Sequence, residues 1–319
     1  MLNALNHRKV DRIPIDLGGT QNSTMCRGAY EHFKAFLGVD APTREMHRAG
    51  ETVIMDEAVL CRLPVDTRPL FVNPPTRSRV RWLDGRNFVS DWGVTYRRPE
   101  DRPQYDIVAH PLAEATIEDL DTYDWPDVED PGRYAGLRDK ARSLHEDTEY
   151  AVCGSIRFTV LFDACWMLRG MQRFLMDLLL DPEFALALME RVAQIQFRQT
   201  HLFLHEVGEY IDVIMIADDM GIQSGLLLRP KLYRQMVKPY HQRYVRHIKE
   251  RTDAKVVMHT CGGVAELVED YIEIGVDALN PMQVSAVGMS TEGLKQRFGG
   301  RMAFWGGIDT QRILPQSVF

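Results

Sequence analysis

The sequence is poor in the features that mark secreted and membrane proteins. Its five cysteines are odd in number and lie far apart, so they predict no framework of disulfide bonds. No stretch approaches the roughly 18 consecutive apolar residues of a membrane-spanning helix. The first residues also lack the apolar segment of a secretory signal. We therefore expect a soluble protein of the cytoplasm.

The chain also lacks an excess of positive charge. It has 38 lysine and arginine residues against 45 aspartate and glutamate residues, a net charge of -7 at pH 7, and no basic stripe. A nucleic acid is not expected as a partner, because binding to its phosphates requires clustered cations. With 319 residues, 45% of them hydrophobic, the chain is long enough to bury a large core.

Several short catalytic motifs are absent as well. No P-loop, nucleophile elbow or His-Glu-x-x-His sequence occurs. Gly18 and Gly19 do not belong to a dinucleotide-binding fingerprint. The function therefore has to be inferred from the places that chemically active residues take in the fold.

The sequence does contain a regular alternation of strands and helices, which predicts parallel strands joined by right-handed crossovers. The expected strands begin near residues 13, 68, 150, 212, 255, 277 and 302, and the expected helices span residues 25–37, 52–63, 158–177, 182–206, 230–250, 264–274 and 291–298. A (β/α)8 barrel needs one strand more. We predict an α/β fold of this kind, a TIM barrel that lacks its last strand and helix because the sequence ends early. An open doubly wound sheet is the alternative.

Residues 1–319 are expected to form one domain with two insertions. Residues 79–96 predict a β-hairpin around Asp84 and Gly85, a favoured pair for a tight turn. Residues 99–132 are rich in proline, aspartate and glutamate and predict a surface excursion with short helical pieces.

His259 and Cys261 are the most informative pair of residues. They follow the strand expected near residue 255, and the active sites of (β/α) barrels form at such strand ends. Residues i and i+2 of an extended chain point to the same side, so an imidazole and a thiol would face one point. These are zinc ligands, and we predict a metal site with Cys261 also in a catalytic role. The alternative is a packed histidine and an unreactive cysteine beside a glycine turn.

Two adjacent carboxylates, Asp218 and Asp219, follow the strand expected near residue 212. Because adjacent carboxylates repel, one of them is a candidate to bind a metal or a substrate cation. We predict that Asp219 points inward as a catalytic residue and that Asp218 binds substrate. The alternative is that one caps a turn and the other is solvated.

Amide and acidic side chains follow three other strands. Asn280 and Gln283 could orient a substrate through their amides, or could serve only in the turn. Gln21 follows the first expected strand and is a candidate substrate-binding residue. Asp309 is another such candidate, in the loop after the seventh strand, where many barrels bind phosphate, although a bare turn is the alternative.

Taken together, these segments resemble the uroporphyrinogen decarboxylase superfamily, and specifically its corrinoid-dependent methyltransferases. The resemblance extends over nearly the whole chain. It is carried by Leu5-Asn6-His7, Asp11-Arg12-Ile13-Pro14, Asp218-Asp219-Met220-Gly221-Ile222-Gln223, Lys238-Pro239, His259-Thr260-Cys261-Gly262, Gly275-Val276-Asp277, Asn280-Pro281-Met282-Gln283, Phe298-Gly299 and Gly306-Gly307-Ile308-Asp309.

The resemblance implies a (β/α)8 barrel and zinc-dependent methyl transfer between a small methylated substrate or thiol and a corrinoid. It implies that the first two zinc ligands are His259 and Cys261 and that the third is a cysteine near the C-terminus, which we expect beyond residue 319. The chain has no Asp-x-His-x-x-Gly signature of corrinoid binding, so the corrinoid is expected on a partner protein.

Two other functions stay open. One is metal-independent decarboxylation of the uroporphyrinogen decarboxylase type, and the other is ligand binding without catalysis. True uroporphyrinogen decarboxylases carry an Arg-Gln-Ala-Gly-Arg run near the N-terminus, but the corresponding residues 18–23 here contain no arginine. A substrate with four carboxylates would need such cations, so this difference argues against a porphyrinogen substrate.

Overall fold

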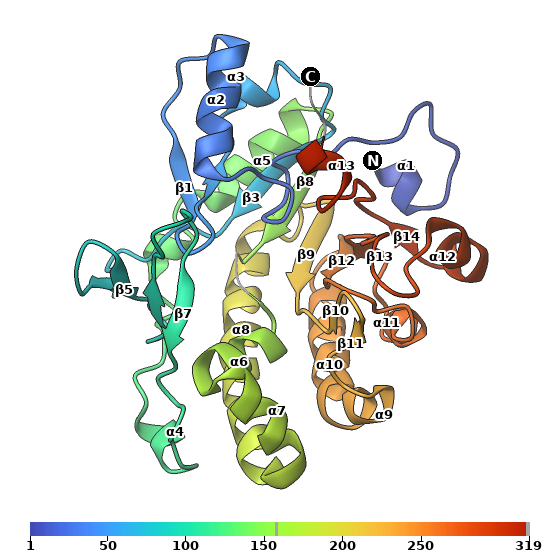
Figure 1. Cartoon of the computed structure of the whole chain (residues 1–319). Coiled ribbons are helices and arrows are strands. Elements are labelled where there is room, and N and C mark those ends of the chain that lie inside the picture. Colours follow the sequence, from blue (N-terminus) through green and yellow to red (C-terminus); the bar gives the residue numbers. More distant parts are fainter. Residues whose placement is uncertain (157–158, 317–319) are drawn as a thin grey trace.

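The computed structural model of the chain describes residues 1–156 and 159–316. Its centre is a parallel sheet of six strands in the spatial order β3, β8, β9, β12, β13, β14 (Figure 1). The spatial order follows the chain order, as in the wall of a (β/α) barrel. The strands are β3 (Thr67–Phe71), β8 (Ala151–Ser155), β9 (Val213–Ala217), β12 (Lys255–His259), β13 (Ala278–Asn280) and β14 (Ala303–Phe304).

Alternate residues of these strands belong to two different hydrophobic cores. Val152 and Ile214 lie in the main core together with residues of the surrounding helices. Their neighbours Cys153 and Met215 lie in a smaller core, which also contains Leu5 from the N-terminal helix. The sheet is thus packed on both faces, with helices on one face and a small core on the other.

The buried carboxylate of Asp16 shows that the sheet curls. The hydroxyl of Thr67, in β3, donates to one oxygen of Asp16 at 2.7 Å, and the indole N–H of Trp305, just after β14, donates to the other at 3.0 Å. Thr67 lies in one outermost strand of the sheet, and Trp305 directly follows the other. One carboxylate can contact both only if the sheet bends round toward closure.

The prediction of a strand that begins near residue 13 is wrong: the segment lies beside β3 but forms no strand. Pro14 has no N–H, and the N–H of Ile15 donates to the side chain of Asp66 at 2.7 Å rather than to a backbone carbonyl. One backbone hydrogen bond remains, from Asp66 to the carbonyl of Ile15, at 2.9 Å. This single bond is too little to make a ladder.

Helices are the second layer of the fold, and within the described residues none has the length and apolar character needed to cross a bilayer. The longer ones are α2 (Arg27–Leu37), α5 (Leu137–Asp147), α6 (Phe162–Arg169), α7 (Met171–Leu180), α8 (Pro182–Val207), α10 (Lys238–Lys249), α11 (Val268–Glu273) and α12 (Thr291–Phe298). The short ones are α1 (Leu2–Leu5), α3 (Glu57–Leu60), α4 (Asp119–Thr122), η1 (Pro131–Arg133), α9 (Pro230–Leu232) and α13 (Ile313–Gln316).

Two of the predicted long helices are interrupted. The helix predicted over residues 158–177 divides into α6 and α7 at Gly170, whose φ of 94° is unfavourable for other residues, and its first residue lies outside the described part of the chain. The helix predicted over residues 230–250 contains a π-helical segment, η2 (Tyr233–Val237). Pro239 lacks an N–H, and the wide turn before it avoids a clash between its ring and the preceding backbone.

The helix predicted over residues 52–63 is wrong for its first half. Three β-branched residues in a row, at 52–54, form strand β2 (Thr52–Ile54), which pairs with β1 (Arg44–His47). The helix α3 starts only after Asp56, whose side chain accepts a hydrogen bond from the N–H of Ala58.

The predicted hairpin is part of a larger inserted sheet. Four antiparallel strands, in the order β4 (Arg81–Trp82), β5 (Asn87–Val89), β6 (Thr95–Arg97) and β7 (Asp106–Ala109), lie beside the parallel sheet (Figure 1). A turn at Gly93, with φ of 76°, divides the stretch predicted as one strand into β5 and β6. The predicted excursion over residues 99–132 supplies β7 and α4.

Candidate metal centre

The register of the parallel strands brings three polar strand ends together. His259, the last residue of β12, pairs with Ala217 of β9 on one side and with Asn280 of β13 on the other. Asp219 follows β9 by two residues, and Cys261 follows β12 by two. The side chains that the sequence places after separate strands therefore meet at one edge of the sheet.

Asp219, His259 and Cys261 form a compact group of potential metal ligands. One ligand atom from each lies within 4.8 Å of the other two. The distance from Cys261 Sγ to His259 Nε2 is 3.5 Å, and that from His259 Nε2 to Asp219 Oδ1 is 3.8 Å. A tetrahedral zinc ion with its usual bond lengths holds a nitrogen and a sulfur about 3.6 Å apart. The three residues therefore fit one zinc ion with a fourth position left for a reactant.

The protonation of His259 is set by its neighbour Asn280. The amide nitrogen of Asn280 donates to the carbonyl of Trp305 at 3.2 Å, which turns its Oδ1 toward His259 Nδ1 at 2.6 Å. Nδ1 therefore carries the proton, and the lone pair of Nε2 points toward Cys261 and Asp219. Asn280, predicted to bind substrate, is 7% exposed and orients this imidazole.

The thiol of Cys261 would not ionise unaided in this environment. Burial and, after it, the nearby carboxylate of Asp219 together raise the pKa of Cys261 to about 12. The backbone N–H of Cys261 donates to Asp219 Oδ1 at 2.8 Å, so the carboxylate is held against the loop. A divalent cation would reverse the local balance of charge and hold the sulfur as a thiolate.

Asp218, the other adjacent carboxylate, has a different position from the one the sequence predicts. It is fully buried and accepts the backbone N–H groups of Leu161, Phe162 and Asp163, each at 3.0 Å. His241 Nε2 lies 2.9 Å from its Oδ2. All of its contacts lie inside the protein, so Asp218 anchors the start of α6 and presents no surface to a substrate.

Asp163 is a residue that the sequence reasoning missed. It is 6% exposed, and its two oxygens accept the backbone N–H of Asp219 at 2.9 Å and the indole N–H of Trp166 at 2.8 Å. Burial raises the pKa of Asp163 well above its usual value, and Asp218 and Asp219 raise it further. Only its helix was predicted, and nothing in a helical pattern marks a carboxylate that contacts a distant strand end.

The remaining predicted site residues take supporting positions. Gln283 Oε1 accepts the N–H of Gly262, next to Cys261, at 2.8 Å, and its Nε2 donates to Gln223 at 2.7 Å. Gln21 Oε1 accepts the hydroxyl of Ser155, at the end of β8, at 2.9 Å. Asp309 accepts the N–H groups two and three residues further along the chain, at 2.8 and 3.1 Å, so it caps a turn.

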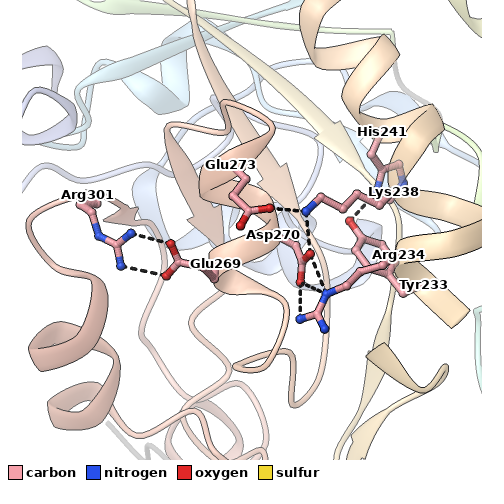
Figure 2. A network of polar contacts seen from close by, with 8 residues as sticks. All are labelled: Tyr233, Arg234, Lys238, His241, Glu269, Asp270, Glu273 and Arg301. Atoms are coloured by element: carbon pink, nitrogen blue, oxygen red, sulfur yellow. Dashed lines mark hydrogen bonds and ion pairs between the residues drawn. The ribbon is translucent and has the colours of Figure 1, made fainter. Parts of the chain in front are cut away.

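A network of polar contacts connects α10 to α11 (Figure 2). Asp270, 3% exposed, accepts hydrogen bonds from Arg234 at 2.9 Å and from Lys238 at 2.7 Å. In the same view the hydroxyl of Tyr233 lies 3.2 Å from His241 Nδ1, and His241 is the partner of Asp218. The network thus connects the outer helices to the carboxylate that anchors α6.

Asp270 is expected to contribute stability that depends on pH. Burial opposes its ionisation, but the hydrogen bonds from Arg234 and Lys238 outweigh it and lower its pKa below 3.8. The contribution is therefore present above the unfolded value and disappears as the pH falls through the lower folded value. Asp270→Asn should lower the free energy of unfolding by about 1–3 kcal/mol at pH 7, as measured by urea unfolding. The loss should be smaller below pH 3.8 than at pH 7. An equal loss at the two pH values would contradict the pH-dependent role of Asp270.

Known proteins agree with this architecture. The model of the Uroporphyrinogen decarboxylase (URO-D) family matches residues 91–317, and the chain therefore belongs to this family. A solved structure described as a methyltransferase from Methanosarcina mazei has a TM-score of 0.51 and 18% sequence identity, covering 90% of this chain and 79% of that one. The likeness shows that the two proteins share a fold. No curated protein sequence matches the chain.

The predicted fold class and family are thus confirmed: the chain has an α/β, TIM-barrel-like fold of the URO-D type. The predicted metal pair lies in one group with Asp219, which the sequence reasoning placed nearby as a catalytic residue.

Proposed function

We propose that this protein is a zinc-dependent methyltransferase that moves a methyl group between a small methylated substrate or thiol and a corrinoid on a partner protein. The observation that carries the proposal is the Asp219, His259 and Cys261 group, since sulfur, nitrogen and oxygen ligands at this spacing suit zinc. Membership of the URO-D family and the fold shared with a structure named as a methyltransferase support it.

Zinc, when bound, would supply a Lewis acid that activates a thiol or the heteroatom of a methyl donor. His259 and Cys261 would hold it, and Asp219 would be a further ligand beside them. Asn280 keeps the lone pair of His259 Nε2 available by binding the proton on Nδ1.

Gln21 is a candidate to bind the substrate. Its Oε1 is held by Ser155, and its NH2 group makes no hydrogen bond to the described part of the chain. It lies at the end of β8, on the same edge of the sheet as the metal centre. The free NH2 group could therefore donate to an oxygen of a substrate.

The proposal is tested by a methyl-transfer assay with the zinc-loaded chain and free methylcobalamin, with simple thiols as acceptors. Formation of a methyl thioether that depends on zinc would support it. Release of carbon dioxide from a carboxylated substrate by the metal-free chain would instead favour a decarboxylase. Zinc binding without turnover in either direction would favour a binding protein.

Gln283 is expected to affect metal binding rather than substrate binding. Because its Oε1 holds the N–H of Gly262 beside Cys261, Gln283→Leu should weaken zinc binding about tenfold. A competition titration with a chelator measures this. Gln296→Leu, at an exposed glutamine of α12, is the matched control. If Gln283→Leu instead raised the KM and left the zinc affinity unchanged, Gln283 would be a substrate-binding residue.

A further inference from the structure

A cavity lies between the inserted sheet and the parallel sheet. Its volume is about 380 Å³, within the usual range for small-molecule sites. Trp92 and Tyr96 line it from the inserted sheet, Val72 and Ile156 from just past the ends of β3 and β8, and Met167 from α6. None of the three candidate metal ligands lines this cavity.

The side chain of Gln199 gives this cavity a polar wall. Gln199 lines the cavity from α8, and it is only 5% exposed. Its amide makes no hydrogen bond to any residue that the structure describes. An amide on a cavity wall can both donate and accept hydrogen bonds, so it suits a ligand that carries a hydroxyl or carboxamide group.

The charged groups at the cavity already have partners in the protein. Arg48 pairs with Glu45 at 2.9 Å, and Arg133 Nε donates to the carbonyl of Asp127 at 2.9 Å. Asp91 accepts the backbone N–H of Arg79 at 2.7 Å. Of these three, only Arg48 has a partner of opposite charge, and the other two bind neutral backbone groups.

Three aromatic rings lie together in the wall, beside aliphatic side chains. Phe88 and Tyr96 both line the cavity and stack on each other, with ring centroids 5.0 Å apart. Trp92 adds a third ring, and Met167 adds a polarisable side chain. A flat aromatic ring can pack on these rings and on the methionine.

We propose that this cavity is a binding site for an aromatic compound that carries one hydroxyl or carboxamide group. The ring would lie against Trp92, Tyr96 and Met167. The polar group would pair with the amide of Gln199. None of the candidate metal ligands lines the site, so binding there can be tested without zinc.

The first test uses the unmodified full chain, without added metal, and phenol as the probe. The chain is labelled with ¹³C at its methionine methyl groups, and phenol is added up to about 10 mM, a range that suits so small a ligand. The methyl signals of Met46 and Met167, which line the cavity, should shift and saturate together. Those of Met215 and Met258, buried in the sheet, should not. No shift, or a shift of all four alike, would overturn the proposal.

The second test removes the polar wall. Gln199→Leu keeps the size of the side chain and should weaken phenol and benzamide about tenfold, the loss of one hydrogen bond. It should leave toluene unchanged or bind it more tightly. Gln194→Leu, at an exposed position of the same helix, is the matched control and should change none of these affinities. An equal loss for phenol and toluene in Gln199→Leu would mean that the cavity had collapsed and that Gln199 recognises no ligand.

Discussion

Cys261→Ser is expected to remove both zinc binding and methyl transfer, with kcat/KM falling at least about 1000-fold. Cys261 Sγ lies 3.5 Å from His259 Nε2 in the group of three ligands, and a serine hydroxyl is a poor zinc ligand that does not ionise near neutral pH. Zinc content by elemental analysis and the rate of transfer from methylcobalamin to a thiol measure the two effects.

The matched control for this change is Cys61→Ser. It exchanges the same atom in an exposed cysteine whose thiol donates only to Glu57, at 3.0 Å, so zinc content and rate should stay within about twofold of the unmodified protein. A Cys261→Ser protein that retained its zinc and its full rate would remove the basis of the proposed function.

The second large effect is expected from Asp218→Asn, and it concerns stability. The carboxylate of Asp218 is fully buried and takes up three backbone N–H groups and His241. An asparagine replaces one acceptor with an NH2 group that faces other donors, and it leaves His241 without its charged partner. We expect a loss of about 3–5 kcal/mol in the free energy of unfolding, a large share of the stability of a typical domain.

The neighbouring Asp219→Asn is the natural comparison. The side chain of Asp219 is 41% exposed and lies in the metal group, so its change should weaken zinc binding and cost less than about 1 kcal/mol of stability. Urea unfolding and a zinc titration of both variants distinguish the two roles. If the two variants lost stability equally, the assignment of Asp218 as the structural residue would be wrong.

The sequence predicts those parts of the site whose positions depend only on the order of the parallel strands. His259, Cys261 and Asp219 all follow parallel strands, and the ends of adjacent parallel strands must meet at one edge of the sheet. Their convergence therefore required no knowledge of side-chain contacts. The spacing of two positions between His259 and Cys261 also placed the histidine and the cysteine on one side.

The sequence could not predict roles that depend on distant partners. Asn280 and Gln283 were correctly placed near the site, but their amides bind His259 and the loop of Cys261. Asp163 escaped notice because its contact with Asp219 joins residues 56 apart in the chain. Asp218 was assigned to substrate because the start of α6, which it anchors, cannot be located from periodicity.

The same limit explains the errors in the fold. The apolar residues at 13–17 suggest a strand, but Asp66 takes the N–H of Ile15 that a ladder would need. The apolar pattern at 52–63 is helical in spacing, but Thr52, Val53 and Ile54 pair with β1 instead. In both segments a tertiary contact outweighs the local preference of the chain.

The central claim is that Asp219, His259 and Cys261 hold one metal ion, and cobalt(II) substitution tests it most directly. The metal-free chain is titrated with cobalt(II) while its absorption spectrum is recorded. We predict saturation at one cobalt per chain, an intense sulfur-to-cobalt charge-transfer band, and the loss of that band in Cys261→Ser but not in Cys61→Ser. A spectrum without this band, or one that Cys261→Ser leaves unchanged, would contradict the account.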